Sequence, residues 1–77
     1  MHRYHVTRIQ DEGCSVSLRD SAGQFHVARV MTEAPSVGSN LAGSVPGLGY
    51  RVLLCVSTNR AFRLTFEQIN CQPPSMN

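Results

Sequence analysis

Residues 50–69 read YRVLLCVSTNRAFRLTFEQI, and this stretch decides the fold class. Two runs with an apolar residue at nearly every second position, 50–57 and 61–69, are typical of strands that bury one face. The three residues between the runs predict a short hairpin loop, which sets Leu54 opposite Leu64 and Arg51 opposite Glu67. The residues expected to share the buried face of this hairpin are Tyr50, Val52, Leu54, Val56, Phe62, Leu64 and Phe66.

The same alternation over residues 3–19 predicts a second hairpin, with Asp11-Glu12-Gly13 as its loop. Glycine suits the third loop position, because a three-residue loop needs a left-handed conformation there. The expected pairs are Gln10 with Cys14, Val6 with Leu18 and His5 with Arg19. A regular ladder would set Arg8 opposite Val16, so we expect a β-bulge near residues 7–9.

A third strand is expected over residues 24–31, after a type I turn at Asp20-Ser21-Ala22-Gly23. A four-residue loop sets Leu18 opposite Phe25 and Val16 opposite Val27. The other face of this strand then carries Ala28 and Val30. A strand that is apolar on both faces is either covered twice or contacts another chain.

Residues 32–49 hold prolines and glycines that interrupt any long element. We expect a long connection with at most a short strand over residues 40–45, in which Leu41 and Val45 face inward. Long connections of this kind are often functional.

Short strands joined by tight turns predict an all-β fold, a five- or six-stranded, partly open antiparallel barrel. An SH3-like barrel is favoured over an OB-like one, because no helical segment separates the third and fourth long runs. Residues 1–70 are expected to form one domain, and residues 71–77 a frayed tail.

Composition excludes several classes of protein. A hydrophobic share of 42% and a charged share of 16% in 77 residues argue against a disordered tail. No apolar run is long enough for a membrane span, so no membrane partner is expected. The net charge is only +2, and all seven basic residues are arginine. A chain this short also has a thin core, which oligomerisation or a partner would support.

Three cysteines, Cys14, Cys55 and Cys71, have no zinc-binding spacing, and no signal peptide is visible. We therefore expect three reduced thiols in a cytoplasmic protein, with Cys14 and Cys55 acting as small apolar residues in strands. His2 and His5 would point to opposite faces of their strand. The sequence thus predicts no catalytic residue, no metal site and no cofactor.

The first functional hypothesis is a non-enzymatic binding module that contacts another protein or a second copy of itself. Its candidate interface residues are Ala28, Val30, Val37 and Leu48. The alternative is a barrel that binds single-stranded nucleic acid through its outer arginine-bearing faces. Its candidate residues are Arg3, His5, Arg19, Arg51 and Arg63. The aromatic residues, among them Phe25 and Tyr50, are expected to face inward, which counts against this alternative.

A second alternative is an oligomeric enzyme whose site forms between chains. Gly49-Tyr50, a hairpin and then Glu67-Gln68-Ile69-Asn70 are similar to the end of the small plasmid-borne dihydrofolate reductase barrels. That family consists of SH3-like chains that build one active site at the centre of a tetramer. Their signature tetrapeptide Val-Gln-Ile-Tyr is missing here, so no residue is assigned a role from this resemblance.

Overall fold

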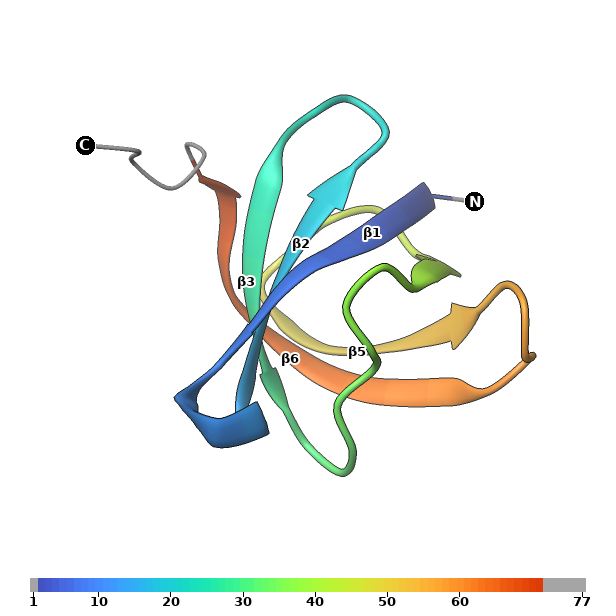
Figure 1. Cartoon of the computed structure of the whole chain (residues 1–77). Helices are drawn as coiled ribbons and strands as arrows, with labels where there is room; N and C mark the ends of the chain where they lie inside the picture. The colour runs from blue at the N-terminus through green and yellow to red at the C-terminus, as the bar shows by residue number, and fades with distance from the viewer. Residues whose placement is uncertain (1, 72–77) are drawn as a thin grey trace.

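The computed structural model describes residues 2–71, without the side chains of residues 70 and 71. Six strands account for most of this range, and they are joined by turns and by one longer connection (Figure 1). The strands are β1 (His2–Gln10), β2 (Ser15–Asp20), β3 (Phe25–Val30), β4 (Asn40–Gly43), β5 (Gly49–Cys55) and β6 (Ala61–Cys71). A short 3-10 turn, η1 (Asp11–Gly13), lies between β1 and β2.

The strands form a closed antiparallel barrel in the order β1-β2-β3-β6-β5-β4, and β4 pairs with β1 to complete the ring. The all-β class and the six-stranded barrel are therefore confirmed. The sequence predicted a partly open barrel, whereas the barrel in the structure is closed. Closure joins His2–His5 to residues 40–43, so the two ends of the sheet pair with each other.

The first hairpin has the expected pairs Val6 with Leu18 and His5 with Arg19. The expected bulge is also present, between Val6 and Arg8. Beyond it, Ile9 lies opposite Val16 and packs against the core, which removes the predicted conflict between Arg8 and Val16.

The loop of this hairpin is one residue longer than predicted. Gln10 pairs with Ser15 instead of Cys14, so Cys14 is an exposed turn residue and not part of a strand. Gly13 has a φ of +93°, the left-handed conformation expected of it. Asp11 and Glu12 also have positive φ values, which the sequence did not indicate.

The β2–β3 turn corrects the predicted register of β3. The amide of Gly23 donates to the carbonyl of Asp20, as a type I turn requires, but Asp20 also pairs with Gln24. The loop is thus three residues long, and Leu18 lies opposite His26 rather than Phe25. Val16 likewise lies opposite Ala28 rather than Val27. As a result Phe25 and Val27 face outward, and the inward residues of β3 are His26, Ala28 and Val30.

The last hairpin forms as an antiparallel pair, but its predicted register is wrong. Leu53 lies opposite Phe62, and Val52 lies opposite Arg63. The loop holds four residues and ends at Asn59, whose φ is +65°. Leu53 and Cys55 therefore face the core. The residues of this segment predicted to be buried but found exposed are Tyr50, Val52, Leu54 and Val56.

The predicted ion pair across this hairpin is absent, because Arg51 lies opposite Leu64. Glu67 instead accepts a hydrogen bond from Arg29 on β3, at 3.1 Å.

The connection from β3 to β5 contains the short strand β4, as expected. Leu41 is fully buried, but Val45 lies beyond the strand and is 60% exposed, so its predicted inward position is wrong. No helix in the described part of the chain is long and apolar enough to cross a membrane. Residue 71 belongs to β6, and the rest of the predicted tail lies outside the described residues.

The core contains an aromatic cluster near one end of the barrel. The rings of Tyr4 and Phe66 meet edge to face at 5.7 Å, and His26 lies 5.9 Å from Tyr4 and 6.0 Å from Phe66. The Tyr4 hydroxyl donates to the carbonyl of Ser44 at 2.7 Å. A histidine thus occupies a position in the core where the sequence predicted a phenylalanine.

Candidate functional surfaces

Four outward side chains lie next to one another across four strands. Asn40 of β4 is opposite His5 of β1, His5 is opposite Arg19 of β2, and Arg19 is opposite Phe25 of β3. Arg3 precedes His5 by two residues and so lies on the same face of β1. We call these five residues the cross-strand row. The row brings together Arg3, His5 and Arg19 of the predicted nucleic-acid set and adds Phe25 and Asn40.

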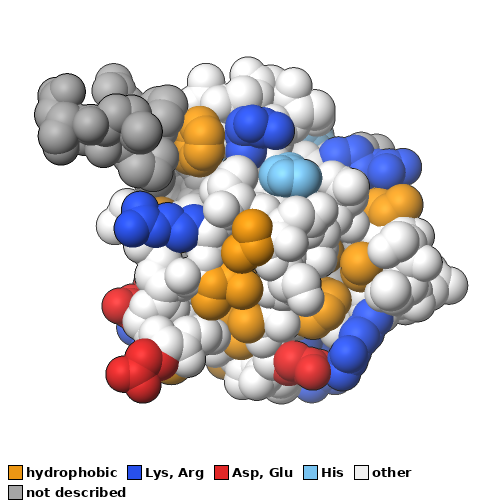
Figure 2. All heavy atoms as spheres, in the orientation of Figure 1, with side chains coloured by type: hydrophobic (Ala, Val, Ile, Leu, Met, Phe, Trp, Pro, Cys, Tyr) orange, Lys and Arg blue, Asp and Glu red, His pale blue; other side chains and the backbone are white. Residues whose placement is uncertain are grey.

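Beside this row is a depression of about 200 Å³. His5 and Asn40 contact each other at its edge, with 3.0 Å between Nδ1 and Oδ1. The residues that line the depression are Arg3, Tyr4, His5, Arg19, Asp20, Ser21 and Asn40. Figure 2 shows arginine and histidine side chains along the upper part of the visible face, where no acidic side chain is seen, and both arginine and acidic side chains in its lower part.

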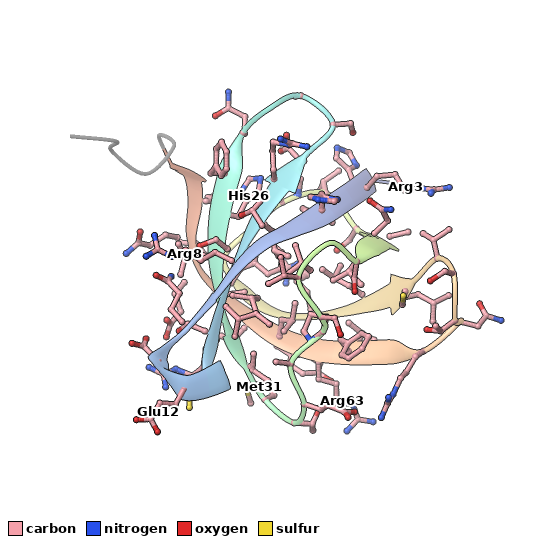
Figure 3. The ribbon with its side chains drawn as sticks, in the orientation of Figure 1. Arg3, Arg8, Glu12, His26, Met31 and Arg63 are labelled. Carbon is pink, nitrogen blue, oxygen red and sulfur yellow. The ribbon has the colours of Figure 1, made fainter. Side chains whose placement is uncertain are left out.

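Asp20 lines the depression, and both oxygens of its carboxylate have hydrogen-bond partners within the protein. Oδ1 accepts hydrogen bonds from the amides of Ala22 at 3.0 Å and Gln24 at 2.9 Å. Oδ2 lies 2.8 Å from Nε2 of His26, whose ring is inside the barrel (Figure 3). Burial by itself raises the pKa of Asp20, but the hydrogen bonds from His26 and the two amides outweigh it and hold this pKa below its ordinary value. Asp20 is therefore an ionised carboxylate whose charge is directed into the protein.

Two arginines of the row have no acidic partner within the described residues. Arg29 pairs with Glu67, and Arg60 pairs with Glu33, on other parts of the surface. Arg3 and Arg19 are exposed, and no ion pair to either is present in the described chain. Their guanidinium groups are thus available to an anion from solution.

The other two predicted arginines do not join the row. Arg51 is half-buried and donates to the carbonyl of Tyr50 at 2.8 Å. Its guanidinium lies against Gly47, so it is not on the outer face where the sequence placed it. Arg63 is exposed on β6 and projects from the lower part of the barrel in Figure 3, well away from Arg3.

A second surface is formed by the outer face of β5 and the residue that follows it. Tyr50, Val52, Leu54 and Val56 are 51%, 47%, 40% and 46% exposed. They occupy alternate positions, so they form one continuous apolar line along the strand. We call them the β5 row. Sequence reasoning missed this surface because it assigned the same four residues to the core.

Of the four predicted interface residues, two face the core and two are exposed. Ala28 is fully buried and Val30 packs against the core, so neither provides the exposed surface that was predicted. Both lie on the inward face of β3 because of the three-residue loop before that strand. Val37 and Leu48 are exposed, at 58% and 61%.

Cys55 ends β5 and lines a second depression, of about 260 Å³, beside Thr58 and Arg60. Hydrogen bonds from Thr58 and Ser57 lower the pKa of the Cys55 thiol from 9.0 to about 7. Cys14 and Cys55 are both free thiols, as predicted, and the side chain of Cys71 lies outside the described residues. Among the described residues, no three His, Cys, Asp or Glu side chains are grouped so that they could hold a metal ion.

Comparison with known proteins gave no match to a protein-family model, a curated protein sequence or a solved structure. The functional argument therefore depends on these two surfaces alone.

Proposed function

We propose that the protein is a non-enzymatic binding module that associates with a second copy of itself through the β5 row. The observation that carries this proposal is the continuous line of four half-exposed apolar side chains on one strand. Isolated apolar residues on a surface are ordinary, but a contiguous row is typical of an interaction site.

A second copy is the occupant that the geometry favours. Two barrel walls with the same apolar line can pack face to face about 10 Å apart, as the sheets of a sandwich do. A two-fold axis through the row would match each patch with itself, which is the commonest arrangement in homo-oligomers. Burial of the row would also enlarge the small apolar core of a 77-residue domain.

The charges around the row allow this arrangement. Arg63 is cross-strand to Val52, so it lies beside the row and not in it. At the rim of an interface its guanidinium would stay in water, where like charges repel only weakly. Four side chains make a small contact compared with a permanent interface, so we expect reversible, concentration-dependent association.

Two further features of the proposal come from the sequence. We propose an SH3-like type of barrel, which the helix-free connection over residues 31–39 supports. We also propose a cytoplasmic location, which the free thiols of Cys14 and Cys55 support.

Sedimentation velocity over a range of micromolar concentrations tests the proposal. The wild-type chain of 8.5 kDa should shift toward twice that mass as its concentration rises. Val52→Lys should remain a monomer, because it puts a charge in the middle of the row. Val37→Lys is the matched control, since it makes the same change at an exposed valine outside the row, and it should associate like the wild type.

A wild-type chain that stays monomeric at all concentrations would contradict the proposal. So would association that Val37→Lys abolishes and Val52→Lys leaves intact, because the interface would then involve the β3–β4 connection instead.

A further inference from the structure

The cross-strand row carries a different chemistry from the β5 row, which it meets at one end, where the amide of Val56 donates to the carbonyl of Asn40. We infer that it binds single-stranded nucleic acid, with a phosphate held between Arg3 and Arg19 and a base stacked on Phe25. This inference does not depend on self-association.

The depression beside the row has the chemistry of an anion site. Arg3 and Arg19 line it, and neither has an acidic partner in the described chain. Guanidinium groups bind phosphate oxygens in a bidentate manner, and the Ser21 hydroxyl and the His5 ring add hydrogen-bonding groups nearby. Its volume of about 200 Å³ is below that of a usual small-molecule pocket, so it suits one phosphate group and not a whole organic ligand.

The one carboxylate in this depression does not cancel the positive charge. Asp20 is oriented toward Ala22, Gln24 and His26, whose hydrogen bonds occupy both of its oxygens. Arg3 and Arg19 are exposed whereas Asp20 is buried, so the arginines are the more accessible charges for a phosphate from solution.

Phe25 distinguishes this row from a simple anion site. It is half-buried on the outer face, directly opposite Arg19. An aromatic side chain beside a phosphate-binding cation is the arrangement by which small barrels hold single strands, because any base can stack on the ring. The inward placement expected of the aromatic residues counted against nucleic-acid binding, and the register of β3 removes this objection for Phe25.

The extent of the row favours a short single strand over a duplex. Adjacent strands are 4.7–4.9 Å apart, so the three steps from Asn40 to Phe25 span roughly 14 Å. A net charge of +2 suits contact with few phosphates. No helix projects from the described residues to enter a groove.

Fluorescence anisotropy with a labelled thymidine dodecamer tests the inference. Each phosphate contact on a single strand contributes about −0.7 to the slope of log affinity against log salt. Two contacts predict a slope of about −1.4, or a loss of about seven-fold between about 50 and about 200 mM salt. Arg3→Gln and Arg19→Gln should each weaken binding and reduce the magnitude of the slope by about 0.7.

Arg63→Gln is the matched control, because it removes the same charge from an exposed arginine outside the row, and it should bind like the wild type. Phe25→Leu should weaken binding of the thymidine dodecamer but not of an abasic strand of equal length. Circular dichroism of every variant should match the wild type, since the exchanged side chains are not in the core.

Three results would overturn the inference. The first is no binding of the dodecamer at low salt. The second is an equal loss in Arg63→Gln and Arg19→Gln, which would show attraction to net charge alone. The third is equal affinity for the dodecamer and the abasic strand, or for inorganic phosphate, which would leave a phosphate site without a role for the base.

Discussion

Asp20 links the surface of the barrel to its interior. One oxygen orders the β2–β3 turn through the amides of Ala22 and Gln24, and the other holds the buried ring of His26. A buried histidine is tolerated only when its ring nitrogens have partners, and Asp20 is the partner of Nε2 of His26.

Acid should therefore destabilise the protein through Asp20. Its pKa is lowered in the folded state, so the stability it contributes is present above its unfolded pKa of about 3.9 and is lost as pH falls through the lower, folded value. Asp20→Asn should cost about 1.5–3 kcal/mol of unfolding free energy at neutral pH and flatten the loss of stability in acid. Urea unfolding at a series of pH values measures both effects.

The control for this prediction is Glu33→Gln. Glu33 belongs to an exposed pair with Arg60, so its removal should leave the acid dependence nearly unchanged. An Asp20→Asn variant as acid-sensitive as the wild type would show that another carboxylate is responsible.

Cys55 should react as an acidic thiol. With a pKa of about 7, close to half of it is thiolate at neutral pH. In a chain carrying Cys14→Ser and Cys71→Ser, the rate of iodoacetamide alkylation should rise with a midpoint near pH 7. Thr58→Val removes the largest cause of the shift and should move the midpoint upward. A midpoint above pH 8 in the Thr58 wild-type background would contradict the assignment.

At the scale of the strand, β5 is a case in which the alternation of apolar residues predicted the wrong buried face. Residues 52–56 are apolar at every position, so both phases of the strand offer an apolar face. The structure buries Leu53 and leaves Leu54 at 40% exposure. The phase depends on the four-residue loop that Asn59 closes in a left-handed conformation, whereas a three-residue loop was predicted.

The two leucines provide a direct test of this register. Leu53→Ala should cost roughly 2–5 kcal/mol, because it opens a cavity in a fully packed core. Leu54→Ala should cost less than about 1 kcal/mol, since most of what it removes is exposed surface. Thermal and urea unfolding of the two variants decide between the registers. A larger loss of unfolding free energy in Leu54→Ala than in Leu53→Ala would support the register expected from alternation.

The elements themselves were predictable, and so were the features set by local chemistry. The hairpins, the bulge near Thr7 and the left-handed Gly13 follow from strand periodicity and turn residues. Registers that depend on loop length were not predictable, because a change of one residue moves every side chain to the other face. Both candidate surfaces were therefore mispredicted in part, since the outward positions of Phe25 and the β5 row depend on those registers.

The two candidate surfaces touch at one end, where the amide of Val56 donates to the carbonyl of Asn40, but their central residues Arg19 and Val52 lie on strands that are far apart in the barrel. In the ring β1-β2-β3-β6-β5-β4, the strands β2 and β5 are three places apart in either direction. The wall that carries Arg19 is therefore opposite the wall that carries Val52. Residues on opposite walls should act independently, so a substitution of Arg19 should leave self-association unchanged and a substitution of Val52 should leave nucleic-acid binding unchanged.

The opposed walls have a geometric consequence for any pair of chains joined through β5. The two Arg19 walls would point away from each other, so the pair would be bivalent and could not place both sites on one short strand. Such a pair should bridge separate strands. Energy transfer between donor-labelled and acceptor-labelled thymidine dodecamers should appear with the wild-type protein at concentrations where it associates. It should be lost with Val52→Lys, which still binds each dodecamer singly, and energy transfer that persists in that variant would show that the bridge forms elsewhere.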